Sequence, residues 1–257
     1  MKYSMCADIM YVAVGEHGPV WPDTDGVIEA MELAKANGLQ AIEFFDWESR
    51  DITKIAAKSK ELEIGIQAFC SKGGEYLGNP EKMNDMIEGF KESVKAAEIL
   101  NCKQLIFNGN AYERNLSREE VHQVMVEGLK KAAPIAEEAG ITIIVEPVSG
   151  GYFVDSAEPF AILDEVGSDN VKLLYDIFHY QLMEGNICNT IKEHLPQIAH
   201  IHGAGAPMRC ELTAGELDYS FILNFLKEIG YDKCFGLEFF TFENRNEKVA
   251  ASCSILP

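Results

Sequence analysis

Three carboxylates and one imidazole stand at the ends of short apolar runs in the second half of the sequence. Glu146 follows ITIIV, Asp176 follows VKLLY, His202 ends IAHIH, and Glu238 follows CFGL. Three carboxylates brought together would repel one another unless a positive charge lay between them. Oxygen ligands with one imidazole suit Mn²⁺, Mg²⁺ or Co²⁺, whereas zinc, the remaining alternative, favours nitrogen and sulfur. We therefore predict that these four residues, named the rim cluster, hold one divalent metal ion.

The spacing of the rim cluster indicates how a fold would bring its members together. The separations along the chain are 30, 26 and 36 residues, and one strand with its following helix occupies about that length. Each apolar run is short, rich in Val, Ile, Leu or Phe, and followed by helix-like sequence, which is typical of a buried parallel strand. The four side chains would thus lie at the carboxyl ends of successive strands, on the face where barrel enzymes carry their active sites.

The rest of the sequence continues the same alternation of strands and helices. Further strands are predicted at residues 1–9, 39–45, 63–69 and 102–109. Helices are predicted at about 23–38, 51–62, 79–100, 117–140, 156–166, 184–195 and 219–229. Eight strands alternating with helices predict an α/β protein, a single (β/α)₈ TIM barrel over residues 1–257. A doubly wound open sheet is the alternative, but the GxGxxG loop that usually follows its first strand is absent.

Local signals mark the ends of some of these helices. Ser117 and Glu120 form a Ser-x-x-Glu capping box at the start of the helix predicted at 117–140. Pro134 lies inside that helix and is expected to kink it or to shift its start. Only about 19 residues follow Glu238, so the eighth helix must be short or irregular.

The composition argues against several classes of protein. Lys and Arg number 22 against 41 Asp and Glu, and the resulting net charge of −19 argues against nucleic acid as a partner. The seven cysteines include no CxxC pair, which favours reduced thiols in a cytoplasmic protein over a disulfide framework. No apolar run approaches 18 residues, so no membrane span is predicted, and the N-terminus is interpreted as a strand and not as a signal peptide.

Further polar residues lie close to the rim cluster in the sequence. His200 and His202 alternate along one strand and point the same way, so only one of them, His202, is expected to reach the rim. His179, in the segment YDIFH, would contact either the ligand residues or the substrate. Arg209 lies in the loop after His202 and could bind a carboxylate or hydroxyl of a small substrate, with a surface ion pair to Glu211 as the alternative. We predict His179 and Arg209 as substrate-binding residues.

Aromatic side chains gather near the ends of the early strands. They could wall a pocket, although aromatic residues in strands more often belong to the core; they are Phe44, Phe45, Trp47, Phe69 and Phe107. Exposed aromatic side chains at the rim would also permit a homodimer.

Longer motifs in the second half of the chain are similar to those of a known family. The segments VEPV, ILDEVGSDNVKLLYDIFHYQLMEG, HIH with its following Arg-x-Glu loop, TAGELDY and GLEFF resemble the xylose-isomerase-like TIM-barrel superfamily. Within it they resemble the hydroxypyruvate isomerase family, strongly over residues 140–240 and weakly before them. The resemblance implies that the rim cluster holds the metal. It also implies that Glu146 and Glu238 are catalytic and face the reacting carbons from opposite sides.

The resemblance leads us to expect a metal-dependent isomerase of a small hydroxy-carbonyl compound, which converts hydroxypyruvate to tartronate semialdehyde through an enediolate. Ketose 3-epimerases or other sugar isomerases are the alternative, because hydroxypyruvate isomerases carry Gln where His202 stands. Those epimerases, in turn, carry Glu where this chain has Gly205. An inosose-type dehydratase and a non-catalytic sugar-binding subunit are further alternatives. The superfamily also includes a phosphodiesterase of abasic DNA, which would need more histidines and a basic groove.

Overall fold

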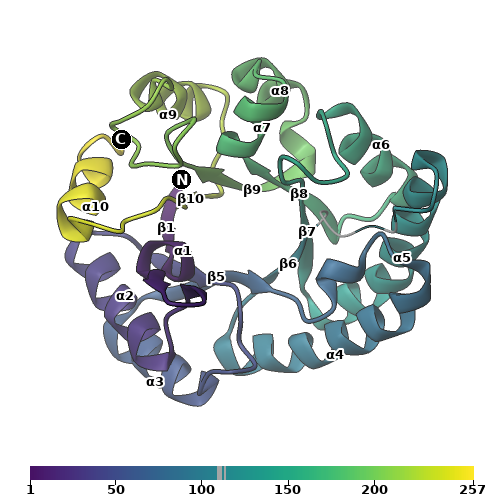
Figure 1. Ribbon diagram of the computed structural model, residues 1–257, viewed down its shortest axis with the longest axis horizontal. Helices are drawn as coiled ribbons and strands as arrows, with labels where there is room; N and C mark the ends of the chain where they lie inside the picture. Colours follow the sequence, from purple (N-terminus) through teal and green to yellow (C-terminus); the bar gives the residue numbers. More distant parts are fainter. Residues whose placement is uncertain (109–111, 113) are drawn as a thin grey trace.

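Eight parallel strands form a closed barrel in the computed structural model, which describes residues 1–108, 112 and 114–257. Figure 1 shows the strands around a central axis with the helices outside them. In order around the barrel they are β1 (Lys2–Cys6), β10 (Cys234–Leu237), β9 (Ile198–Gly203), β8 (Val171–Asp176), β7 (Thr142–Glu146), β6 (Gln104–Asn108), β5 (Gly65–Cys70) and β4 (Ala41–Phe44). The predicted (β/α)₈ barrel is confirmed. The last residue of the strand predicted at 102–109, Gly109, lies outside the described residues.

Helices follow the strands and cover the outside of the barrel. The larger ones are α2 (Thr24–Ala36), α3 (Ile52–Leu62), α4 (Met83–Leu100), α5 (Arg118–Ala139), α6 (Ala157–Val166), α9 (Tyr219–Glu228) and α10 (Arg245–Ser254). The Ser117 capping box is present with both of its hydrogen bonds. Pro134 does not shift the start of α5, which runs through the proline with the loss of one backbone hydrogen bond. The eighth helix, α10, is short, as expected from the few residues that remain.

The first predicted strand, 1–9, is too long, because β1 ends at Cys6. A helical turn, α1 (Ala7–Tyr11), and a small hairpin of β2 (Ala13–Gly15) and β3 (Gly18–Val20) follow it. Asp8 is the physical reason for the early end: its buried carboxylate accepts hydrogen bonds from Arg50 Nη1 at 3.0 Å and from the backbone nitrogen of Phe45. A straight continuation of β1 would carry this charge away from its partners.

The segment after β8 also differs from the prediction. A helix, α7 (Ile177–Met183), begins directly after Asp176, whose side chain accepts a hydrogen bond from the backbone nitrogen of Phe178 at 2.8 Å. The helix predicted at 184–195 is present as the shorter α8 (Ile187–Glu193). The α7 turn was missed because its apolar residues continue the strand-like run without a Gly or Pro to separate them.

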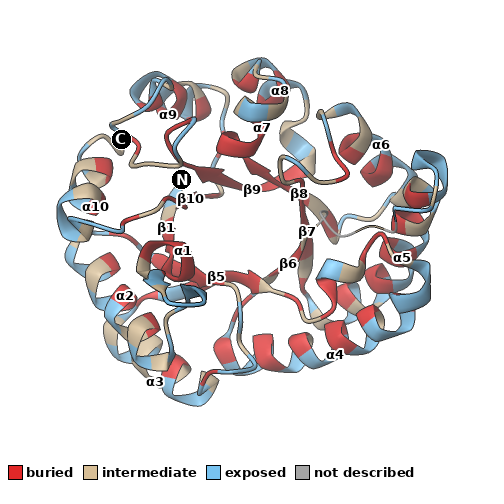
Figure 2. Cartoon of the chain, viewed as in Figure 1, coloured by how far each residue is buried: buried red, intermediate tan, exposed pale blue. Residues whose placement is uncertain are grey.

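The interior of the barrel is packed, so that chemistry must take place at one of its ends. Small and branched side chains from five neighbouring strands form a separate buried cluster, namely Ala68, Ile106, Ile144, Leu174 and Ala199. The alternate residues of the strands face the helices, where Phe90 of α4 packs edge to face on Phe107 at 5.3 Å. Figure 2 shows buried strands inside a ring of helices whose outer faces are exposed.

The aromatic residues near the early strand ends divide into two groups. Phe44, Phe69 and Phe107 are fully buried in the hydrophobic core, so their interpretation as pocket walls is wrong. Phe45 and Trp47 are partly exposed beside that core. Among the described residues, no helix has both the length and the apolar character needed to cross a membrane.

Candidate metal and proton-transfer site

The rim cluster gathers at the carboxyl ends of four neighbouring strands. Glu146 and Asp176 end β7 and β8, His202 is the penultimate residue of β9, and Glu238 directly follows β10. Strand pairing places Asp176 opposite His202. One donor atom from each of the four side chains lies within 4.8 Å of the others. The four residues that residue type, strand-end position and spacing selected therefore lie close together.

Burial and charge make this site suitable for a cation. The side chains of Asp176 and His202 are 1% exposed, that of Glu238 is 3% and that of Glu146 is 9%. The His202 Nδ1 atom lies 3.0 Å from Glu238 Oε2 and 3.6 Å from Glu146 Oε1, yet it makes no well-directed hydrogen bond. A buried imidazole nitrogen among three carboxylates fits the donor set of a divalent cation.

Arg209 enters the rim cluster from the loop that follows β9. Its Nη2 donates to Glu238 Oε2 at 2.5 Å and to Asp176 Oδ2 at 3.1 Å, while its Nε donates to the backbone oxygen of Glu238 at 3.2 Å. The alternative ion pair with Glu211 is wrong, because Glu211 lies 3.5 Å from Lys248 Nζ instead. The guanidinium of Arg209 therefore offsets part of the negative charge of the site.

His179 contacts the same groups from α7. Its Nε2 lies 3.4 Å from Asp176 Oδ2 and 3.2 Å from Arg209 Nη1, and its Nδ1 lies 3.0 Å from Ser149 Oγ. The ring is buried, so these contacts hold its orientation. The guanidinium of Arg209 also lies 5.0 Å from the ring centre of Phe178, in cation–π geometry. His179 and Arg209 thus form one side of the site.

The electrostatics of the site depend on the close pairing of these groups. Burial raises the pKa of Glu238, but the charges of Arg209 and His202 outweigh it and hold that pKa well below its usual range. Burial lowers the pKa of His202, but the charges of Glu238 and Glu43 outweigh it and raise that pKa well above its usual range. Without a metal the cluster therefore balances its carboxylates with a proton on His202 and with Arg209.

Sequence reasoning missed Glu43, which contacts His202 from the first half of the chain. Glu43 lies in β4, and its carboxylate is buried between the rings of His200 and His202. His200 lies one layer deeper than His202, so the choice of His202 for the rim agrees with the geometry. A carboxylate inside the apolar run AIEFF was the available signal, because a buried charge needs partners.

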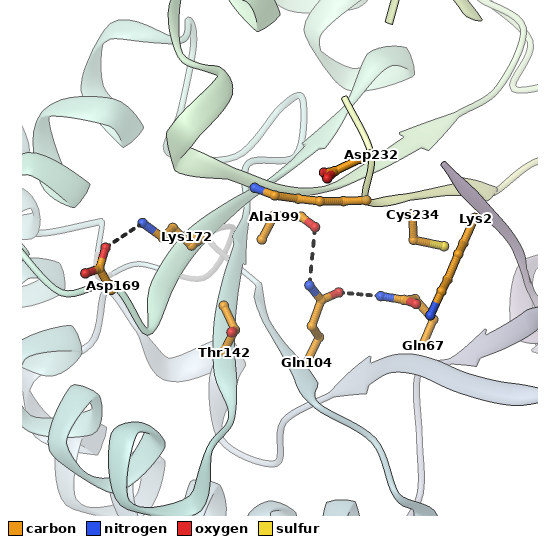
Figure 3. A pocket seen from close by; sticks show the side chains of 10 residues that line it. Lys2, Gln67, Gln104, Thr142, Asp169, Lys172, Ala199, Asp232 and Cys234 are labelled. Atoms are coloured by element: carbon orange, nitrogen blue, oxygen red, sulfur yellow. Dashed lines mark hydrogen bonds and ion pairs between the residues drawn. The ribbon is translucent and has the colours of Figure 1, made fainter. Parts of the chain in front are cut away.

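The opposite, amino-terminal end of the barrel contains none of the rim cluster residues. A cavity of about 390 Å³ there is lined by the starts of the strands and none of the rim cluster. Gln67 Nε2 donates to Gln104 Oε1 at 2.7 Å, and Gln104 Nε2 donates to the backbone oxygen of Ala199 at 3.2 Å (Figure 3). Lys172 pairs with exposed Asp169 at 3.2 Å. The two glutamine contacts link strands at the amino-terminal end of the barrel, the end that in this fold serves stability and not catalysis.

A parallel barrel with a buried carboxylate and imidazole cluster at its carboxyl rim defines the class of this protein. The chain belongs to the xylose isomerase-like TIM barrel family, whose sequence profile matches residues 31–257.

Curated relatives carry isomerase names. The putative hydroxypyruvate isomerase of Mus musculus is 30% identical over 239 residues, which cover 86% of this chain and 86% of the relative. The hydroxypyruvate isomerase of Escherichia coli K12 is 25% identical over 222 residues, which cover 81% and 85%. The 2-oxo-tetronate isomerase of Cupriavidus necator is 25% identical over 224 residues, which cover 82% and 86%. These names support an isomerase activity for this chain.

Solved structures share the fold. A structure described as an AP endonuclease of family 2 from Brucella melitensis superposes with a TM-score of 0.86 at 21% identity, covering 100% of this chain and 99% of that one. An L-ribulose 3-epimerase superposes with a TM-score of 0.83 at 18% identity, covering 99% and 93%. At such identities the likeness concerns the barrel alone.

Proposed function

We propose that this chain is a divalent-metal-dependent isomerase that interconverts hydroxypyruvate and tartronate semialdehyde. The observation that carries the proposal is the rim cluster, in which donor atoms of three buried carboxylates and of His202 all lie within 4.8 Å of one another. The hydroxypyruvate isomerase names of the relatives support the choice of substrate. We also propose that residues 1–257 form a single domain, since the barrel uses strands from both ends of the chain.

The reaction moves two hydrogens and needs no oxidant. Carbon 3 of hydroxypyruvate loses a proton and carbon 2 gains one, while the hydrogen of the hydroxyl on carbon 3 is replaced by one on the oxygen of carbon 2. Carbon next to a carbonyl is a weak acid, so a carboxylate in water removes this proton slowly. A divalent cation in the site would stabilise the negative charge that develops on the substrate oxygens.

Glu146 and Glu238 are the proposed acid and base. Glu146 is the most exposed side chain of the rim cluster, which gives it access to a bound substrate. Glu238 is a carboxylate held in its charged form by Arg209 and His202, so it enters the reaction without a proton, and it can accept one once the substrate takes over some of these contacts. Both also belong to the proposed ligand set; at least one therefore keeps one oxygen free for proton transfer. Asp176 and His202 serve as ligands only.

Arg209 and His179 are the proposed substrate-binding residues. A guanidinium presents planar pairs of N–H donors that match a carboxylate such as that of hydroxypyruvate. Arg209 is positioned for this role by its bonds to Asp176 and Glu238, and His179 Nε2 lies 3.2 Å from its Nη1. Substrate binding would exchange some of these internal contacts for contacts with the ligand.

The loop after β9 has no space for the Glu that the resemblance places there in ketose 3-epimerases, which argues against that alternative. Gly205 stands where those epimerases carry Glu, and a Cβ atom there would lie 2.2 Å from the backbone oxygen of Ala214 and 2.7 Å from Cys210 Sγ. A larger residue would therefore force the loop to move. The retained ligand residues argue against a non-catalytic sugar-binding subunit, and the net charge of −19 argues against a DNA substrate.

The test follows proton exchange by NMR. The purified protein is incubated with Mn²⁺ and hydroxypyruvate in D₂O, quenched, and freed of metal before spectra are recorded, with ketohexoses and inososes in parallel samples. We expect tartronate semialdehyde with deuterium on carbon, and loss of turnover in Glu146→Gln and Glu238→Gln. Normal turnover in both variants, or in the presence of excess EDTA, would remove the proposal. Turnover of ketohexoses or inososes alone would favour the epimerase or dehydratase.

A further inference from the structure

Glu43 lies behind His202, on the side of the ring that faces away from the rim cluster. Its Oε2 is 2.9 Å from His202 Nε2, and its Oε1 and Oε2 are 2.9 and 3.0 Å from His200 Nε2. Ser4 Oγ donates to Oε1 at 2.5 Å. All four side chains are buried to 1% exposure or less. We name these residues, Ser4, Glu43, His200 and His202, the Glu43 network.

The contacts of Glu43 determine which nitrogen of His202 carries hydrogen. Ser4 Oγ donates to Glu43, and the Nε2 atoms of both His200 and His202 face its two oxygens, so this buried acid is held as a carboxylate, which can only accept. His202 Nε2 must therefore donate, and in the neutral ring its Nδ1 then holds a free lone pair. That Nδ1 is the atom that faces Glu146 and Glu238. A metal-ligating histidine is commonly held in this way, with its second nitrogen donating to a carboxylate.

Strand β10 leaves the space that the Glu43 network needs. Gly236 pairs with His202 in the sheet, and a Cβ atom at position 236 would lie 2.5 Å from Glu43 Oε1 and 2.8 Å from His202 Cδ2. It would also lie 3.2 Å from His200 Nε2. Any side chain larger than hydrogen would thus displace Glu43 or turn the ring. The glycine at this position is explained by the network beside it.

We infer that Glu43 is a positioning residue, which holds His202 as the Nε2–H tautomer and keeps its Nδ1 directed at the carboxylates of the proposed metal site. The inference rests on the metal site proposed above and extends it to the first half of the chain. The network could itself be considered as a second metal site, since Glu43, His200 and His202 lie close together. Its atoms already satisfy one another, however, and His200 Nδ1 lies 3.1 Å from the backbone oxygen of Cys234.

Two measurements on Glu43→Gln test the inference. First, Mn²⁺ binding is measured by the EPR signal of the free ion, and we expect affinity to fall roughly 10–100-fold, the usual effect of removing such a partner. Second, long-range ¹H–¹⁵N NMR of the metal-free protein, in a pH series extended until His202 is neutral, reports its tautomer. We expect Nε2–H in the wild type and a shift towards Nδ1–H in the variant. The His202 signals are assigned with His202→Gln.

Matched variants separate positioning from general damage to the barrel. Ser4→Ala removes a donor to Glu43 but keeps its bond to His202, so Mn²⁺ affinity should stay close to that of the wild type. Gly236→Ala keeps Glu43 but displaces it, so affinity should fall. Circular dichroism checks that each variant is folded. If Glu43→Gln does not fold, the wild-type tautomer still decides, because Nδ1–H in the neutral ring would overturn the inference.

The remaining outcomes separate this inference from the function on which it rests. A wild type that binds no Mn²⁺ removes the proposed metal site. The wild type could bind one ion while folded Glu43→Gln keeps both the wild-type affinity and the Nε2–H tautomer. That result would remove only the positioning role of Glu43. Two bound ions in the wild type and one in Glu43→Gln would instead make the Glu43 network a second metal site and overturn the inference.

Discussion

Asp176→Asn should uncouple metal binding from the stability of the fold. The substitution keeps the shape of the side chain and the oxygen that accepts from the backbone nitrogen of Phe178, so the start of α7 should persist. It removes one of three negative charges that share the site within 4.8 Å. It also weakens the contact with Arg209 Nη2 at 3.1 Å, which in the native site offsets that charge. The expected loss is therefore in cation binding and not in folding.

The size of the effect follows from the linkage between binding and unfolding. A cation at 100 times its dissociation constant stabilises the folded state by about 2.7 kcal/mol. For a chain of this size, that corresponds to a rise in Tm of roughly 5–10 °C. In Asp176→Asn at the same Mn²⁺ concentration, most of this rise should disappear. Without metal, its Tm should equal or exceed that of the wild type, because one source of carboxylate repulsion is gone.

The assay is thermal unfolding followed by circular dichroism after EDTA treatment, with and without added Mn²⁺. Asp169→Asn is the matched control, because Asp169 is fully exposed beside Lys172 at the other end of the barrel and should leave the rise in Tm unchanged. An equal rise in Asp176→Asn and in the wild type would refute the assignment of Asp176 as a ligand. No rise in the wild type at millimolar Mn²⁺ would refute the site itself.

Three further predictions concern the substrate, the pH and the fold. Arg209→Met should raise KM for hydroxypyruvate by about 10–100-fold, the equivalent of one or two charge-assisted hydrogen bonds. It should not weaken Mn²⁺ binding. An unchanged KM in steady-state assays would contradict the role of Arg209 in substrate binding. Because Glu238 helps to raise the pKa of His202, a cation must displace a proton from that ring. Mn²⁺ affinity should therefore be greatest above this pKa and fall as the pH drops through it. A flat pH profile in Mn²⁺ titrations would contradict this expectation. Arg50→Met should lower the free energy of unfolding, measured in urea titrations, by about 3–5 kcal/mol, because Asp8 is then buried without an ion-pair partner. A change below ~1 kcal/mol would show that Asp8 finds another partner.

Sequence periodicity predicted the barrel because parallel strands and their helices repeat at nearly constant length. Short apolar runs bounded by caps such as that at Ser117 identify the elements locally. The same local signals failed after β1 and β8. The chain turns into α1 at Asp8 and into α7 after Asp176, and in each case a carboxylate gains hydrogen-bond donors. The donor to Asp8 is Arg50, far along the chain, and the donor to Asp176 is the backbone of Phe178 in the turn itself. Apolar runs that continue across such turns hide them.

The sequence by itself predicted the order of the eight barrel strands, the larger helices and the four rim residues, because one strand-helix unit separates each pair and carboxyl ends meet on one face of a barrel. Only the tertiary structure decided what surrounds them. Glu43 and His202 are 159 residues apart and meet because the barrel closes through β1 and β10. Arg209 turns toward Asp176 and Glu238, and not toward Glu211, because these two fully buried carboxylates attract its charge more strongly than the half-buried Glu211 does.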